Sequence, residues 1–233
     1  MTQPSELKLS VVIPTFNERS NIDELLRRLA QALPEIPYEV VFVDDDSPDG
    51  TADWVRGLAR RNSAVRVVHR IGRRGLASAC IEGMLASCAP VIAVMDADLQ
   101  HDETILPQMY EAVAGRGNDL AIGSRYVEYG SAASFSRGRA RLSRLGTDFA
   151  QYLLPSPVAD PMSGFFMLRR DVFMSCVRDL SPMGFKILFD VLVSAPGKLK
   201  VVEVPFNFRE RFSGASKLDS VVMWDFLMFI AER

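Results

Sequence analysis

The sequence contains few cysteines, and their spacing fits no metal site. Cys80, Cys88 and Cys176 are the three cysteines in 233 residues. An odd number of cysteines with no extracellular feature around them indicates reduced thiols in a cytosolic setting. The sequence also lacks an excess of positive charge, because its formal net charge is −2. This balance argues against a general nucleic-acid binder, which would be strongly basic.

Leader-like and membrane-spanning runs are also missing. Residues 1–10 have neither the basic nor the apolar region of a signal peptide. No apolar run reaches the length of about 20 residues that a membrane-spanning helix needs. The segment 219–233 comes nearest, since residues 221–230 read VVMWDFLMFI. We expect it to be an amphipathic helix at a membrane interface, and the sequence to stop just before or within a membrane-associated part.

Short apolar runs alternate with helical patterns along the first 125 residues. The runs at 9–14, 38–43, 65–69 and 91–95 predict buried strands, and each is followed by polar residues. Helical patterns separate them, and we expect Asn21 to cap the first helix with Glu24 at the capping-box position. The alternation predicts one α/β domain with a mostly parallel central sheet flanked by helices.

The most informative stretch is VIAVMDADLQH, residues 91–101. Apolar residues lead directly to Asp96 and Asp98, which would point to the same side of an extended backbone. Ligands of open parallel sheets bind outside the carboxyl ends of the strands. Two carboxylates beside the amide of Gln100 suit Mg²⁺ or Mn²⁺ carrying a diphosphate. The alternative is a turn in which the aspartates cap the next helix.

Further polar residues converge on the same predicted edge. Glu18 follows the first strand and the acidic run 44–46 follows the second. Residues 137–144 contain four arginines and no acid, which indicates either a solvated helix surface or an anion site.

Eight segments, taken in order, resemble one family. They are VVIPTFNERSNI, VFVDDDSPDGT, GLASA, MDADLQH, IGSRY, DPMSGFFMLRRDVF, GFKIL and FRERFSGASKL, and they cover nearly the whole chain. The sequence resembles the inverting GT-A glycosyltransferases of family 2, which have a Rossmann-like fold, and within them the dolichyl-phosphate (polyprenyl-phosphate) mannose synthases. The resemblance implies a catalytic domain at residues 1–218, followed by the apolar segment 219–233.

The resemblance implies a nucleotide pocket at the first two strand ends and a metal site after the fourth. The positions that match the nucleotide pocket are Pro14, Phe16, Glu18, Val43, Asp44 and Asp46. Asp96 and Asp98 match the metal-binding pair, with Gln100 as a further ligand. The Mg²⁺ or Mn²⁺ would neutralise charge on the departing nucleoside diphosphate. Lys217 either approaches the donor diphosphate or holds its own loop in place.

The resemblance also implies that the acceptor is a lipid monophosphate. Such an acceptor is already an oxyanion near neutral pH, so it needs cationic positioning rather than a strong general base. The positions that match the phosphate-holding set are Arg125, Arg139 with Ser143, and Arg211, and with Asp98 these arginines form the implied catalytic set. We expect His101 to be structural, Asp160 and Ser163 to build a turn or contact the sugar, and Lys186 to be a solvated helix residue.

The implied reaction is transfer of mannose from GDP-mannose to a polyprenyl phosphate, with inversion, at the cytoplasmic face of a membrane. The sequence leaves three alternatives open: UDP-glucose or another UDP-sugar as donor, a polysaccharide as acceptor, and a non-catalytic module that binds nucleotide sugars.

Two departures from the family stand out. Asp102 and Glu103 replace two prolines that are common after the DLQH string, and Arg73-Arg74-Gly75-Leu76-Ala77 replaces a lysine-glycine-leucine-glycine segment.

Overall fold

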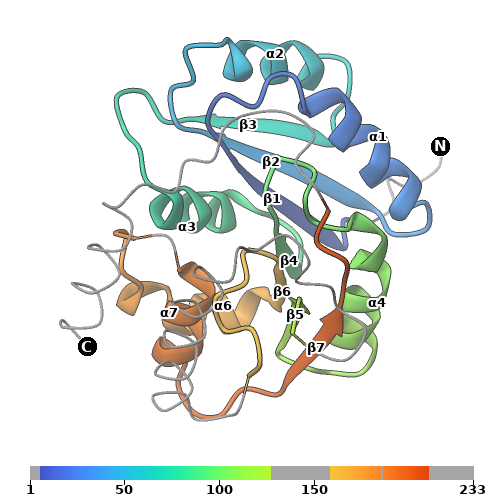
Figure 1. The fold of residues 1–233 in the computed structure, drawn as a ribbon, viewed down its shortest axis with the longest axis vertical. Coiled ribbons are helices and arrows are strands. Elements are labelled where there is room, and N and C mark those ends of the chain that lie inside the picture. The colour runs from blue at the N-terminus through green and yellow to red at the C-terminus, as the bar shows by residue number, and fades with distance from the viewer. Residues whose placement is uncertain (1–5, 127–157, 185, 210–233) are drawn as a thin grey trace.

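The computed structural model describes residues 6–126, 158–184 and 186–209. Within these residues seven strands form one sheet in the order β3-β2-β1-β4-β6-β5-β7 (Figure 1). Every pairing is parallel except those of β6, which runs antiparallel to both β4 and β5. The predicted α/β fold with a mostly parallel sheet is therefore confirmed. The strands are β1 (Leu9–Thr15), β2 (Tyr38–Asp44), β3 (Val65–His69), β4 (Val91–Val94), β5 (Leu120–Ser124), β6 (Phe166–Arg169) and β7 (Val201–Pro205).

Helices cover both faces of the sheet, and each face has its own hydrophobic core. Neighbouring residues of a strand point to opposite faces, so Val11 and Ile13 enter one core while Val12 enters the other. The first core is covered by α1 (Ile22–Ala32), α2 (Thr51–Ala59) and α4 (Leu106–Tyr110). The second is covered by α3 (Leu76–Ala86), α6 (Arg170–Cys176) and α7 (Ile187–Ser194), which lie together at the left in Figure 1.

The order of the strands creates one place where a ligand site is expected. The chain runs outward through β1, β2 and β3, then returns to place β4 beside β1 on the other side. In open α/β sheets ligands bind at such a reversal of strand order, outside the carboxyl ends of the strands. The segments that follow β1 and β4 carry Phe16, Glu18, Asp96 and Asp98. The topology therefore places these predicted site residues at the same edge, formed by the carboxyl ends of neighbouring strands.

The predicted capping box at the first helix is wrong. Asn21 is the residue before α1, but its side chain makes no capping hydrogen bond to that helix. Its amide Nδ2 donates to Glu18 Oε2 at 2.7 Å instead. Glu24 does not reach back either, because it binds Arg27 and Arg28 along the helix. The residue before α1 thus holds Glu18 in place within the loop that follows β1.

Several predicted features lie outside the described residues. These are the arginine-rich stretch 137–144 with Arg139 and Ser143, the loop with Arg211 and Lys217, and the segment 219–233. In the three described ranges, no helix has both the length and the apolar character needed to cross a bilayer.

Gly83 permits α3 to pack closely against the sheet. A Cβ atom at this position would overlap Val12 Cγ1 and lie 2.8 Å from Val43 Cγ2. We expect Gly83→Ala to lower the free energy of unfolding by about 1–3 kcal/mol, since overpacked cores carry costs of that size. Gly57→Ala is the matched control: nothing lies within 4 Å of its added Cβ, and alanine favours the helix. Equal urea midpoints for the two variants would contradict this packing.

Candidate active site

The loop that follows β4 is bent rather than extended. β4 ends at Val94, and residues 97–99 form a bend. The expectation that an extended backbone carries both aspartates is therefore wrong. Leu99 adopts a left-handed backbone, with φ of 64°, which is strained for a bulky residue. Its side chain is buried in the first core, and that burial holds the bend in place.

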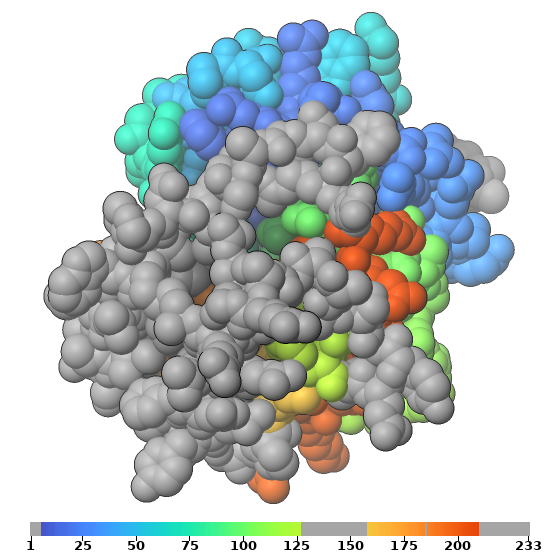
Figure 2. Space-filling view, viewed as in Figure 1, coloured from blue at the N-terminus to red at the C-terminus, as the bar shows by residue number. Residues whose placement is uncertain are grey.

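The bend gives the two carboxylates different surroundings. Asp98 is buried, and its Oδ1 accepts a hydrogen bond from Gln100 N at 3.1 Å. The side chain of Asp96 is 43% exposed, so it faces the space outside the sheet. In Figure 2 the green atoms of this part of the chain lie recessed near the centre of the molecular face, beside the orange-red atoms of the β7 region.

His101 supports Asp96 from the protein side. Its Nδ1 accepts a hydrogen bond from Asp96 N at 3.1 Å, and its ring stacks on Phe165 with 5.0 Å between centroids. Burial lowers the pKa of His101 from 6.5 to about 4, so the ring is neutral at pH 7. A neutral ring that accepts at Nδ1 carries its proton on Nε2, which lies 3.7 Å from Asp96 Oδ2. The expected structural role of His101 agrees with this geometry.

The residues around Asp96 fit a divalent cation. A Cβ added to Gly164 would lie 3.4 Å from Asp96 Oδ2, so a larger side chain here would cover the carboxylate. Carboxylate and amide oxygens are the hard ligands that Mg²⁺ and Mn²⁺ prefer. No group of three or more His, Cys, Asp and Glu that could hold a metal occurs in the described part of the chain. A cation bound by Asp96 and Asp98 would therefore take other ligands, such as Gln100 or a diphosphate.

Asp44 and Val43 turn inward at the end of β2. Asp44 is fully buried and accepts hydrogen bonds from Ser47 N (3.0 Å), Ser47 Oγ (2.6 Å) and Thr15 Oγ1 (3.2 Å). These bonds join the loops after β1 and β2. The side chain of Val43 is packed in the second core, so a ligand outside the sheet could reach only its main chain. The side chains of both residues therefore lie beneath the surface of this edge and support it.

Phe16, Asp46 and Arg74 gather on the outer side of the same edge. The guanidinium of Arg74 lies over the ring of Phe16, 4.1 Å from its centroid. Asp46 binds Gly72 N and His69 Nε2, both at 3.1 Å, and these bonds lower its pKa. Phe16 therefore offers an aromatic surface next to a carboxylate and a cation, a combination that suits a nucleobase and ribose.

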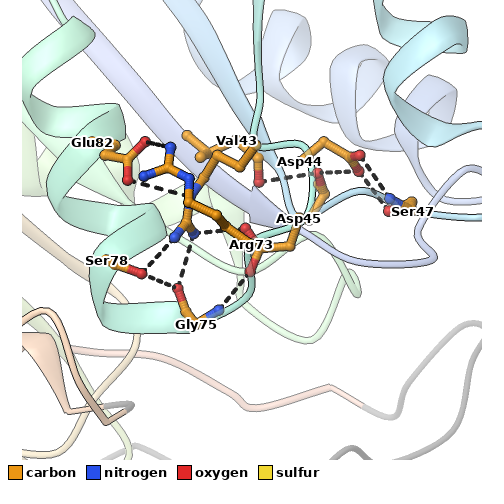
Figure 3. A network of polar contacts seen from close by, with 10 residues as sticks. Val43, Asp44, Asp45, Ser47, Arg73, Gly75, Ser78 and Glu82 are labelled. Atoms are coloured by element: carbon orange, nitrogen blue, oxygen red, sulfur yellow. Dashed lines mark hydrogen bonds and ion pairs between the residues drawn. The ribbon is translucent and has the colours of Figure 1, made fainter.

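A network of polar contacts, buried at Asp45 and Arg70, fixes the loop between β3 and α3. Asp45 accepts hydrogen bonds from Arg70 Nη1 (2.6 Å) and Gly75 N (2.8 Å). Arg70 also binds Ser78 Oγ at 2.6 Å, and Arg73 pairs with Glu82 at 2.8 Å (Figure 3). Each charge in this network faces a partner, as buried charges must. The network holds the loop that carries Arg74 against the end of β2.

Arg125 and Asp160 form a buried ion pair beside the aspartate loop. Arg125 Nε lies 2.9 Å from Asp160 Oδ2, and Nη2 lies 3.0 Å from Oδ1. The Asp160 side chain is 1% exposed. Ser163 closes the turn after Asp160, because its N donates to Asp160 O and its Oγ to Gly123 O. Asp160 and Ser163 thus build the tight turn that was one of the two expectations for them.

Lys186 lies close to Arg125, Asp160 and Asp96, although the sequence analysis expected a solvated helix residue. It precedes α7, and burial together with the nearby Arg125 lowers its pKa to about 8, while Asp160 and Asp96 act in the opposite direction. A solvated helix residue would not feel these four influences together, so that expectation is wrong. The GFKIL string itself contained the signal, since its lysine stands among apolar residues next to a helix start.

The structure therefore brings most of the predicted set to one edge. Phe16, Glu18 and Asp46 lie at its β1–β2 side, and the aspartate loop and Arg125 lie at its β4–β5 side. Pro14 is part of β1 and only half-buried. The side chain of Val43 does not face this edge, and Arg139, Arg211 and Lys217 lie outside the described residues.

Comparison with known proteins gives a family. The model of glycosyl transferase family 2 matches residues 10–176. The chain belongs to glycosyltransferase family 2. It is 42% identical over 227 residues to the dolichol-phosphate mannosyltransferase of Pyrococcus furiosus. The alignment covers 96% of this chain and 63% of that protein's length. The chain thus spans less than two thirds of the archaeal relative.

Two further relatives come from a yeast and a bacterium. The dolichol-phosphate mannosyltransferase of Saccharomyces cerevisiae is 33% identical over 235 residues, covering 97% of this chain and 86% of its own. The undecaprenyl-phosphate mannosyltransferase of Micrococcus luteus is 34% identical over 223 residues, covering 93% and 90%.

Solved structures of the same fold support the GT-A architecture. The glucosyl-3-phosphoglycerate synthase of Mycobacterium tuberculosis in complex with UDP superposes with a TM-score of 0.66 at 21% identity, over 96% of this chain and 80% of that one. Its complex with Mn²⁺, UDP-glucose and phosphoglyceric acid gives a TM-score of 0.63 at 22% identity, over 91% and 74%. Divalent metal use thus occurs within this fold, and identities this low establish the fold alone.

The neutral state of His101 predicts a pH dependence of stability. Because the folded pKa is about 4 and the unfolded value 6.5, the unfolded chain binds more protons between these two values. The contribution of His101 is therefore complete above 6.5 and is lost as the pH falls through 4. We expect the free energy of unfolding of His101→Gln to lie below that of wild type at neutral pH, and this difference to shrink as the pH falls over that range. Urea unfolding of both proteins at several pH values measures the difference. A difference that does not change with pH would contradict the prediction.

The burial of the Arg125–Asp160 pair predicts a large cost when it is broken. We expect Asp160→Asn to lower the free energy of unfolding by about 3–5 kcal/mol, because Arg125 would remain as an uncompensated charge. Asp171→Asn is the matched control: its partner Arg169 is 42% exposed, and surface pairs contribute about 1 kcal/mol or less. Equal decreases in the free energy of unfolding of Asp160→Asn and Asp171→Asn, measured with urea, would show that the burial of the pair is unimportant.

Proposed function

We propose that this chain is the catalytic domain of an inverting, metal-dependent mannosyltransferase that moves mannose from GDP-mannose to a polyprenyl or dolichyl phosphate. The observation that carries the proposal is the kinship: relatives at 33–42% identity from an archaeon, a yeast and a bacterium are named as mannosyltransferases acting on dolichol phosphate or undecaprenyl phosphate. The carboxylates of the aspartate loop and the nearby Arg125 support the proposal.

The donor would bind across the carboxyl ends of β1, β2 and β4. Phe16 can stack near the base, while Glu18 and Asp46 can accept hydrogen bonds from the base or ribose. In this arrangement the diphosphate points toward Asp96. Asp96 and Asp98, with Gln100, would hold Mg²⁺ or Mn²⁺, which when bound supplies neutralisation of charge on the leaving nucleoside diphosphate. Lys217 is proposed to approach the same diphosphate.

The acceptor would bind on the opposite side of the aspartate loop. A lipid monophosphate is an oxyanion that attacks without a strong base, so positive charge must hold it. Arg125 stands beside Asp96 and is fixed in orientation by Asp160. Arg139 and Arg211 are proposed to complete the phosphate-holding set, and Lys186 adds a cation at the same place. Attack from this side, opposite the leaving nucleotide, inverts the anomeric carbon.

The proposed acceptor also fixes where the reaction occurs. The tail of a polyprenyl phosphate stays in the bilayer, so the enzyme must work at a membrane surface. We place it at the cytoplasmic face, with residues 1–218 as the catalytic domain and residues 219–233 as an interfacial segment. A UDP-sugar donor and a polysaccharide acceptor are the alternatives that an assay must separate.

Loss of one carboxylate should abolish transfer. We expect Asp98→Ala to reduce mannolipid formation by about a hundredfold or more, since even residues that merely support metal ligands cost 10–100-fold when changed. Asp53→Ala is the matched control, because the Asp53 side chain is 83% exposed on α2. The assay combines purified protein, a polyprenyl phosphate and a panel of GDP- and UDP-sugars, with and without Mn²⁺. Transfer from a UDP-sugar alone, or normal activity of Asp98→Ala, would overturn the proposal.

A further inference from the structure

Glu203 holds the turn that carries Asp160 from a neighbouring strand. Glu203 lies on β7, and its two carboxylate oxygens accept hydrogen bonds from two consecutive main-chain N–H groups. Oε2 accepts from Ala159 N at 2.8 Å, and Oε1 accepts from Asp160 N at 3.0 Å. Hydrogen bonds to an ionised carboxylate are about twice as strong as neutral ones. The side chain of Glu203 therefore fixes the main chain at the residue that pairs with Arg125.

Asp160 passes this constraint on to Arg125. Its carboxylate accepts hydrogen bonds from Arg125 Nε and Nη2, and also from Arg125 N at 3.3 Å. Three hydrogen bonds from the main chain and side chain of one residue restrict that side chain to a narrow range of orientations. Because the Asp160 side chain is almost fully buried, bulk water does not compete for these bonds.

The chain of β7 supports Arg125 a second time. Cζ of Arg125 lies 5.6 Å from the centre of the Phe208 ring, three residues beyond the end of β7, and 5.4 Å from the centre of the Tyr126 ring. A guanidinium is attracted to the face of an aromatic ring at such distances. In the parallel pairing of β5 and β7, Glu203 stands opposite Ile122, three residues before Arg125. The sheet therefore fixes the main chain of Glu203 relative to that of Arg125.

We propose that Glu203 is a positioning residue, which acts through Asp160 to orient the guanidinium of Arg125 for the acceptor phosphate. The inference rests on the proposed function, because Arg125 is a described arginine that is proposed to hold that phosphate. Arginine binds phosphate through N–H groups in a rigid planar fork, so the orientation of this plane decides how well the phosphate is held. Glu203 affects the acceptor in this arrangement without touching it.

A purely structural role of Glu203 would have different consequences. If its hydrogen bonds only joined the turn to the sheet, their loss would lower the free energy of unfolding and leave the orientation of Arg125 unchanged. The residues proposed to bind the nucleotide follow β1 and β2, whereas the hydrogen bonds of Glu203 lead to Asp160 and Arg125. A positioning role therefore predicts a defect that is limited to the acceptor.

The first test is the substitution Glu203→Gln. The amide NH₂ that replaces one carboxylate oxygen is itself a donor, so one of the two bonds to the main chain is lost. Glu111→Gln is the matched control, because the Glu111 side chain is 61% exposed. We expect Glu203→Gln to raise the KM for polyprenyl phosphate about tenfold to hundredfold, the cost of small misplacements in an active site. The Kd for GDP with Mn²⁺, measured by calorimetry, should equal that of wild type in both variants.

Proton exchange of the Arg125 Nε–H group with water tests the positioning without any substrate. NMR detects this group, and the signal that disappears in Arg125→Lys identifies it. The hydrogen bond to Asp160 Oδ2 protects it, so we expect exchange to be faster by about tenfold or more in Glu203→Gln than in wild type or Glu111→Gln. Glu203→Asp keeps two acceptor oxygens on a shorter side chain. It should give an intermediate rate, and it serves as the test if Glu203→Gln does not fold.

Arg125→Lys also separates positioning from a general effect on the turn. In this background Glu203→Gln should raise the KM little further, because the guanidinium that it positions is absent. Equal rises in KM in both backgrounds, or unchanged exchange of the Arg125 Nε–H in Glu203→Gln, would overturn the inference. So would a Kd for GDP that weakens as much as the KM rises. If wild type transfers no mannose to polyprenyl phosphate, the proposed function fails, and the exchange rate still decides whether Glu203 positions Arg125.

Discussion

Carboxylates crowded at the ends of buried strands are the constraint on which this structure depends. Such groups are stable only where donors or cations compensate them. Three buried acids at this edge have a partner from another part of the chain: Asp44 has Thr15, Asp45 has Arg70, and Asp160 has Arg125. Asp96 is the more exposed member of the proposed metal-binding pair, and His101 accepts a hydrogen bond from its main-chain N. The edge is therefore preorganised with one side of its acidic pair facing outward.

The same compensation links the proposed donor and acceptor sides of the site. Lys186 and Arg125 face Asp96 and Asp160, so the pKa of Lys186 depends on the protonation of both acids. Arg209 ties Asp102 and Glu103, and hence the aspartate loop, to the chain that leads away from β7. A charged donor bound at Asp96 would change the electrostatic field at Arg125 and Lys186, the described cations that are proposed to hold the acceptor. Coupling of this kind suits a transfer between two anionic substrates.

Much of this architecture could be predicted because the signals are local. The apolar runs that became β1 to β4 end in polar residues, and alternation alone places those ends on one edge. The bend at Leu99 could not be predicted, because a left-handed leucine is stable only through its burial in the core. The pairing of Glu18 with Asn21 in place of a capping box, and that of Arg209 with Asp102 and Glu103, depend on the tertiary fold, which the local sequence does not encode.

The central claim is that Asp96 and Asp98 hold the cation and diphosphate at the point where β1 and β4 meet. Crystals grown with Mn²⁺ and GDP, with an anomalous difference map at the manganese edge, test it most directly. The account predicts one strong peak within coordination distance of both carboxylates, with the diphosphate beside it and the base near Phe16. A manganese peak elsewhere, with GDP bound away from this edge of the sheet, would contradict it.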